Sequence, residues 1–317
     1  MTHVILLALA PVFFVMALGF VAGRWRTIDN HHVGELNALV MDFALPASLF
    51  VATASAPRSV MMAQGGLFAI LSFAMLLVYA FWYLIAGRLL KASRAEAAVQ
   101  ALTVALPNYA AAGLPIVSAI LGPTEVVPVA IAIAAGSILP SPLTLLLLEL
   151  SGGEGRAGGA AALTARVGRA LRGALTKPIV LGPIFGIMLS LCGLRLDAVA
   201  HASLQLIGQA AGGVALFLTG LILSAQPLRL DWTVAGAAAT ANIVQPVLVA
   251  ATVFLLPIPY SIAKLTILLA ALPSGFFGIL FGVKYAAASA EAGSMVVAST
   301  VLSIATLAIA IAVLYPR

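Results

Sequence analysis

Two segments of the chain combine a proline with small and polar residues in the middle of apolar stretches. They are Pro107, Asn108, Tyr109 and Gly113 in the first, and Pro273, Ser274, Gly275 and Gly278 in the second. Proline removes a helical hydrogen bond and disfavours helical geometry in the residue before it, so each stretch is expected to be interrupted there. Asn and Ser are good N-cap residues, so Asn108 and Ser274 could each open a new half-helix.

The chemistry that such a pair of half-helices offers is anion binding. A helix N-terminus presents unpaired N–H groups and about half a positive charge. Two such ends directed at one point would bind a carboxylate without a buried cation. The matched positions of the two prolines therefore predict two crossing broken helices with an anion site between them.

Asp42, within LVMDFALPASLF, is the one ionisable residue that lies well inside a predicted membrane span. A charge in the membrane interior costs several kcal/mol, so such residues are functional by default. Asp42 is either a coupling site for a proton or another cation, or a partner for the backbone freed by Pro46. Ser48 is expected to face the anion site from the same helix. Asn242 and Gln245 are polar residues in another span, which line the cavity or join helices.

The composition requires that membrane helices position these residues. The chain has 317 residues, 63% hydrophobic and 8% charged, against about 25% charged in a soluble domain. Ten stretches are each long enough to cross the membrane. They cover residues 4–23, 33–53, 65–87, 97–121, 126–150, 178–194, 203–225, 232–256, 263–284 and 291–315. The predicted fold class is an all-α integral membrane protein of about ten transmembrane helices.

The two halves of the chain resemble each other at a nearly constant offset. The matched pairs are Pro107 with Pro273 and Ser137 with Ser303 at 166, and Pro11 with Pro178, Gly19 with Gly186 and Phe50 with Phe217 at 167. Such a register predicts two five-helix repeats, 1–150 and 178–317, joined by a cytoplasmic linker, 151–177. Because each unit has an odd number of spans, the second enters the membrane from the opposite side, as in the inverted repeats of secondary transporters.

Charge predicts the orientation of the chain. Of the sixteen Lys and Arg residues, twelve lie on one side of a ten-helix arrangement and four on the other. The four are Arg58, Arg195, Lys264 and Arg317. Because cytoplasmic loops carry the excess, both termini are expected on the periplasmic side of a bacterial cytoplasmic membrane. The basic residues occupy short connections instead of one face, so the net charge of +6 does not indicate nucleic-acid binding.

The sequence lacks the motifs that several other functions require. The sequence has no Walker A motif, no HExxH motif and no Cys/His cluster, so we expect no nucleotide, cofactor or metal. An intramembrane aspartyl enzyme would need a second carboxylate beside Asp42, and all four histidines fall near helix ends or in loops. We therefore predict that the protein is not an enzyme. Cys192, the single cysteine, lies in an apolar run and is expected to be a small buried residue.

Three motifs resemble those of the auxin efflux carrier family, and the resemblance covers essentially the whole chain. They are ALPNYAAAGLPIV, GGVALFLTGLILSAQP and AALPSGFFGILFGVKY. MDFALPAS and TVALPNYAAAGLPI are most similar to the bacterial malonate transporters. The resemblance implies a scaffold of helices 1, 2, 6 and 7, and a transport domain of helices 3–5 and 8–10 that moves against it. It also suggests a homodimer through the scaffold.

The family's crossover prolines fall on Pro107 and Pro273, and its carboxylate-binding asparagine falls on Asn108. Ser274 stands where the plant carriers have a larger polar residue, which leaves this contact open and would suit a smaller, doubly charged substrate. The resemblance thus implies an elevator-type secondary transporter of malonate or a related dicarboxylate. The predicted binding residues are Pro107, Asn108, Tyr109, Gly113, Pro273, Ser274, Gly275 and Ser48, with Asp42 as candidate for coupling to a proton or sodium ion. The alternatives are another carboxylate, an amino acid, or a passive anion channel.

Overall fold

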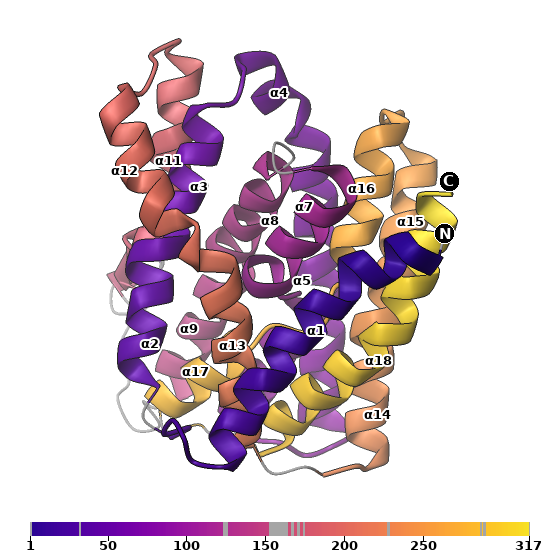
Figure 1. The fold of residues 1–317 in the computed structure, drawn as a ribbon. Helices are drawn as coiled ribbons and strands as arrows, with labels where there is room; N and C mark the ends of the chain where they lie inside the picture. Colours follow the sequence, from indigo (N-terminus) through magenta and orange to yellow (C-terminus); the bar gives the residue numbers. More distant parts are fainter. Residues whose placement is uncertain are drawn as a thin grey trace.

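The computed structural model describes residues 2–31, 33–122, 126–151, 164–165, 168–169, 172–173, 175–226, 229–285, 287 and 290–316, with backbone alone at 2–4, 283–284 and 290. Within these ranges every regular element is a helix (Figure 1). The predicted linker, 151–177, lies mostly outside the described residues.

The helices of the first half of the chain are α1 (Thr2–Arg24), α2 (Gly34–Ala38), η1 (Leu39–Ala44), α3 (Leu45–Ala54), α4 (Arg58–Ala63), α5 (Gly65–Arg88), α6 (Arg94–Ala105), η2 (Tyr109–Gly113), α7 (Leu114–Leu121), α8 (Val127–Ile138) and α9 (Pro140–Ser151). Those of the second half are α11 (Pro178–Leu191), α12 (Ala198–Gly208), α13 (Ala210–Ser224), α14 (Trp232–Ala239), η3 (Thr240–Val244), α15 (Gln245–Leu255), α16 (Tyr260–Ala270), α17 (Phe277–Lys284) and α18 (Ala290–Leu314).

Seven helical spans in the described ranges are long and apolar enough to cross a membrane. They are Ile5–Arg24, Gly34–Ala54, Arg58–Arg88, Val127–Ser151, Ala198–Ser224, Trp232–Leu255 and Glu291–Leu314. Shorter apolar helices cover Tyr109–Leu121, Pro178–Leu191 and Tyr260–Ala270. The spans are apolar on their outer faces too: on α1, Leu7 is 60% and Phe14 67% exposed. A helix that is apolar all round requires lipid or protein on every side, so the chain is a multi-pass membrane protein.

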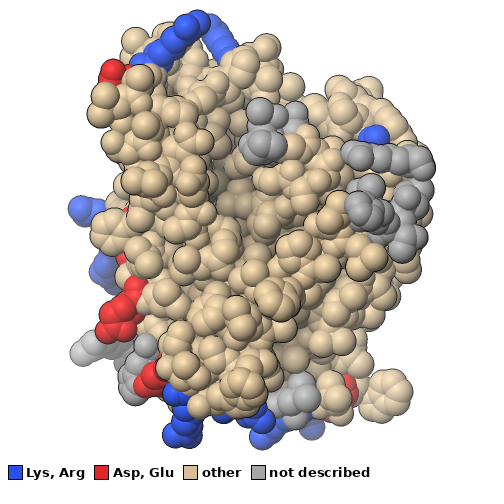
Figure 2. Space-filling model, in the orientation of Figure 1, with Lys and Arg blue, Asp and Glu red and all other residues tan. Residues whose placement is uncertain are grey.

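The charged residues are distributed as this placement requires. Figure 2 shows Lys and Arg at the bottom of the view, at its upper tip and at points along its left and right edges, whereas the broad face over α1 and α18 is almost entirely uncharged. The α3–α4 and α11–α12 connections lie at the top of the same view, and the α1–α2 connection lies at the bottom (Figure 1). The uncharged face over α1 and α18 therefore lies between two polar ends.

Several helix boundaries differ from the sequence prediction, two of them for a clear local reason. The helix predicted at 65–87 is preceded by α4 within one continuous span. The helix predicted at 203–225 begins at Ala198, because the Asp197 carboxylate accepts from the N–H groups of Val199 and Ala200. The helix predicted at 178–194 ends at Leu191, since Gly193 adopts a φ of 71° that continues no right-handed helix.

Each of the three π-helical turns, η1, η2 and η3, is followed by a proline two residues later. The prolines are Pro46, Pro115 and Pro246, each at the second position of the next α-helix. Proline donates no hydrogen bond to the preceding turn, and a widened π turn accommodates the missing donor. η1 and η3 lie inside continuous helical spans, whereas η2 begins the helix that follows the interruption at Pro107.

Glycines allow α1 to lie against α13, and α3 against α11, at backbone contact. A Cβ atom added to Gly19 would collide with the Phe217 carbonyl oxygen, and one added to Gly186 would lie 2.7 Å from the Phe50 carbonyl oxygen. Gly19 precedes Gly186 by 167 residues and Phe50 precedes Phe217 by the same number. The two helix pairs thus use corresponding residues of the two halves of the chain.

Candidate functional site

Two extended segments, Leu106–Asn108 and Pro273–Gly275, cross antiparallel in the interior of the molecule. The Asn108 N–H donates to the Pro273 carbonyl at 2.8 Å, and the Gly275 N–H donates to the Leu106 carbonyl at 2.8 Å. Both predicted helix interruptions are therefore present, between α6 and η2 and between α16 and α17. Hydrogen bonds between the segments satisfy backbone groups that no helix pairs, which a membrane interior demands.

Asn108 begins the second half of its helix, as the sequence predicts. Its side chain is 2% exposed, and its Oδ1 accepts a 3.1 Å hydrogen bond from the Ala111 N–H. Its backbone carbonyl accepts from the N–H groups of Ala112 and Gly113. The amide nitrogen Nδ2 donates to none of the described residues. Capping therefore uses the acceptor of the Asn108 amide and leaves its donor for a ligand.

Ser274 does not open a half-helix, so its predicted N-cap role is wrong. α17 begins three residues later, at Phe277, because the Ser274 backbone is held in the extended crossing. The Ser274 N–H donates to Ser299 Oγ at 2.9 Å, and that hydroxyl donates to Asn242 Oδ1 at 2.6 Å. All three side chains are buried. A hydrogen-bonded chain thus connects the second crossing segment to α18 and η3.

Gln245 stabilises the other segment. Its Nε2 donates at 3.0 Å to the carbonyl of Ala105, the last residue of α6. The Tyr109 N–H would pair with this carbonyl in an unbroken helix, but it donates to Pro107 instead. Asn242 and Gln245 therefore join helices at the crossing, which is one of the two roles left open by the sequence. Ser299 was not predicted, although it is a polar residue in an apolar helix.

The glycines of the two segments allow the close approach. A Cβ atom on Gly275 would lie 3.1 Å from the Leu106 carbonyl oxygen, and one on Gly113 would lie 3.0 Å from Leu272 Cδ1. Tyr109 is buried with its hydroxyl 3.6 Å from Met75 Sδ, so this hydroxyl contacts α5. The segments themselves contain no charged residue, and their polar groups are amides and hydroxyls.

Asp42 and Ser48 lie beside α11 and α12. Asp42 is exposed on the surface of the chain and borders a hollow of about 430 Å³, whose other walls include Pro178 and Leu204. Ser48 lies against Gly208, where a Cβ atom would be 3.0 Å from the Ser48 backbone. Asp42 is inside the span Gly34–Ala54, as predicted, and its grouping with Asn108 stays a prediction.

Cys192 is exposed, so the prediction that it is buried is wrong. It is the C-cap residue of α11 and falls outside the helix because of the turn at Gly193. Among the described residues no three His, Cys, Asp or Glu side chains come together in a group that could hold a metal ion.

Apolar helices of membrane-crossing length, with two interrupted helices that cross in the interior, define the class of helical membrane transporters. A family model described as membrane transport protein matches residues 4–311, and the chain belongs to this family. It is similar to the uncharacterized transporter YfdV of Escherichia coli K12, E. coli O157:H7 and Shigella flexneri. Each relative is 27% identical over 282 residues, covering 87% of both chains. The predicted auxin efflux carrier resemblance is thus confirmed at the level of the family.

Proposed function

We propose that this transporter is a secondary carrier of a small organic acid anion, with malonate or a related dicarboxylate as its substrate. The observation that carries the proposal is the buried Asn108, which caps a half-helix at a hydrogen-bonded crossing and keeps its Nδ2 donor free. That donor, at the N-terminal end of η2, suits a carboxylate. No buried cation is needed, so the site can be emptied without leaving an unpaired charge in the membrane.

The architecture that we propose is ten transmembrane helices in two inverted repeats, 1–150 and 178–317. The equivalent contacts of Gly19 with Phe217 and of Gly186 with Phe50 support it. Backbone contact between these helices suits a rigid scaffold of helices 1, 2, 6 and 7. The crossing segments would then belong to a transport domain of helices 3–5 and 8–10, which carries the anion in an elevator-type movement.

Uptake of labelled malonate into proteoliposomes tests the substrate and the coupling. We expect saturable uptake with counterflow, which a passive channel does not show, and stimulation by an inward pH or sodium gradient. Asp42→Asn is expected to lower gradient-driven uptake to the level without a gradient, because the neutral amide no longer binds the coupling cation. Asp197→Asn is a matched control, since asparagine also caps helices well, and should transport normally.

Two results would contradict separate parts of this proposal. If malonate and related dicarboxylates show no uptake in any gradient while another solute is transported, the substrate assignment is wrong and the carrier fold stands. If Asp42→Asn responds to the gradient as the unmodified protein does, Asp42 has no coupling role.

Because Cys192 is exposed and is the single cysteine of the chain, the proposed orientation can be tested by labelling the unmodified protein. It lies beside Gly193 and Arg195 at the end of the molecule with few basic residues, which we assign to the periplasm of a bacterial cytoplasmic membrane. A membrane-impermeant maleimide should therefore label the protein in intact spheroplasts, and Cys192→Ser should not be labelled. Thr27→Cys in that variant, on the exposed α1–α2 connection, should react only after permeabilisation. The reverse labelling pattern would show that the proposed orientation is wrong and that Cys192 lies on the cytoplasmic side.

A further inference from the structure

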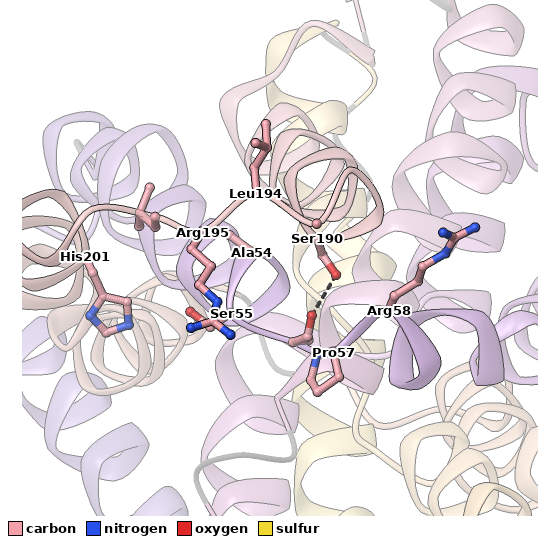
Figure 3. Close-up of a pocket in the computed structure, with 11 residues that line it drawn as sticks. Ala54, Ser55, Pro57, Arg58, Ser190, Leu194, Arg195 and His201 are labelled. Carbon is pink, nitrogen blue, oxygen red and sulfur yellow. Dashed lines mark hydrogen bonds between the residues drawn. The ribbon is translucent and has the colours of Figure 1, made fainter.

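A hollow of about 550 Å³ lies where the α3–α4 and α11–α12 connections meet, far along the chain from the crossing segments. Its polar lining consists of Ser55, Arg58, Ser190, Arg195 and His201, and no Asp or Glu is among the lining residues. Figure 3 shows the Arg195 guanidinium reaching toward Ser55, with His201 on one side, while Arg58 extends in the opposite direction. The hollow thus offers donors and cations to a ligand, and no carboxylate competes for them.

The walls of the hollow are fixed by the chain itself. Ser190 is buried, and its Oγ donates a 2.6 Å hydrogen bond to the Ala56 carbonyl, which joins the end of α11 to the α3–α4 connection (Figure 3). The turn at Gly193 then redirects the chain toward Arg195. The nearby acid, Asp197, uses its carboxylate to cap α12. Arg195 is therefore presented by an anchored turn.

The charge at this end of the molecule is unusual for its side of the membrane. Only four of the sixteen Lys and Arg residues belong to this side, and two of them line this hollow. Neither guanidinium forms an ion pair or hydrogen bond with a described residue. These two arginines work against the proposed orientation, because basic residues favour the cytoplasmic side of the membrane. A binding role accounts for their presence.

We propose that this hollow is an oxyanion-binding site, separate from the crossing segments, in which Arg195 binds a carboxylate or phosphate group with help from Ser55 and His201. A planar guanidinium pairs with two oxygens at once, and hydroxyl and imidazole donors complete the coordination of such a group. Arg58, at the opposite end, suits a second anionic group. Two sources carry this chemistry, a free small dianion and the phosphate of an anionic outer-leaflet lipid. The proposal does not depend on which solute is transported.

Cys192 allows a direct binding measurement, since it precedes the lining residue Gly193 and is the protein's single thiol. We would attach an environment-sensitive fluorophore to it in lipid-free detergent and titrate malonate, and separately inorganic phosphate. We expect a saturable signal that weakens at least about tenfold in Arg195→Gln, because a charge-assisted contact is lost. Arg88→Gln, the same change at the other end of the molecule, should bind normally. Calorimetry with inorganic phosphate on unlabelled protein guards against interference by the fluorophore.

A second arm distinguishes the two sources of the oxyanion. In nanodiscs of phosphatidylcholine with and without phosphatidylglycerol, a lipid ligand would change the signal with lipid composition and block malonate, and Arg195→Gln would abolish both effects. A free anion would bind equally in both discs. Either result supports an oxyanion site. Absence of saturable binding in every arm, or unchanged binding in a folded Arg195→Gln protein, would overturn the proposal, whatever the transport assay shows.

Discussion

Replacing Asn108 with alanine is expected to lower carboxylate uptake by about tenfold to a hundredfold while the protein stays folded. The change removes the Nδ2 donor, and a hydrogen bond to a charged group contributes about 1.5–3 kcal/mol. It also removes the cap on Ala111, at a cost of about 1 kcal/mol. The backbone bonds between the crossing segments do not involve the side chain, so the crossing should persist. The measurement is initial uptake in proteoliposomes at matched amounts of folded protein.

A second variant separates binding from capping. Asn108→Asp keeps a good N-cap but replaces the amide donors with a negative charge, so it should transport no better than the alanine variant. Asn30→Ala removes an amide that pairs with Ser224 at the end of α13 and should transport normally. Uptake by Asn108→Asp equal to that of the unmodified protein would exclude the amide from the anion site.

The helix interruptions could be predicted because proline weakens a helix locally and because two prolines stand at matched positions in the two halves of the chain. Pro107 and Pro273 stand in the middle of apolar stretches, and the structure interrupts both helices there. The N-cap role of Asn108 could be predicted for a similar reason, since capping depends on residues within one turn. The same rule failed for Ser274, because hydrogen bonds to Leu106 and Ser299, far away in the sequence, hold this segment extended.

The hydrophobic pattern of the sequence could not predict which way individual side chains point. In a soluble protein the polar face of a helix identifies its outer side, but a membrane helix is apolar on all sides and gives no such signal. Asp42 was correctly placed within a span, yet its position beside α11 and α12 depends on the rotation of η1 about its axis. The exposure of Cys192 depends on the φ of Gly193, which the apolar run around it did not indicate.

The contact between α1 and α13 yields the largest expected effect on stability. A Cβ atom on Gly220 would collide with the Met16 carbonyl oxygen and lie 2.8 Å from the Phe20 backbone nitrogen. Backbone atoms cannot rotate away as a side chain can, so Gly220→Ala must push the two helices apart. Overpacking of this kind costs about 1–3 kcal/mol or more, and we expect the melting temperature in detergent to fall by several degrees.

The same helix supplies the matched control. A Cβ atom on Gly213 would meet nothing within 4 Å, so Gly213→Ala should be neutral or should stabilise the helix by about 0.5–1 kcal/mol. Gly186→Ala, at the corresponding contact of α11 with α3, should destabilise as Gly220→Ala does, because its Cβ also meets backbone. Equal melting temperatures for Gly220→Ala and Gly213→Ala would mean that α1 and α13 do not touch at Gly220. Gly19 is the counterpart of Gly186, so a loss of stability in Gly19→Ala without one in Gly186→Ala would remove the equivalence of the two helix pairs on which the proposed inverted repeat rests.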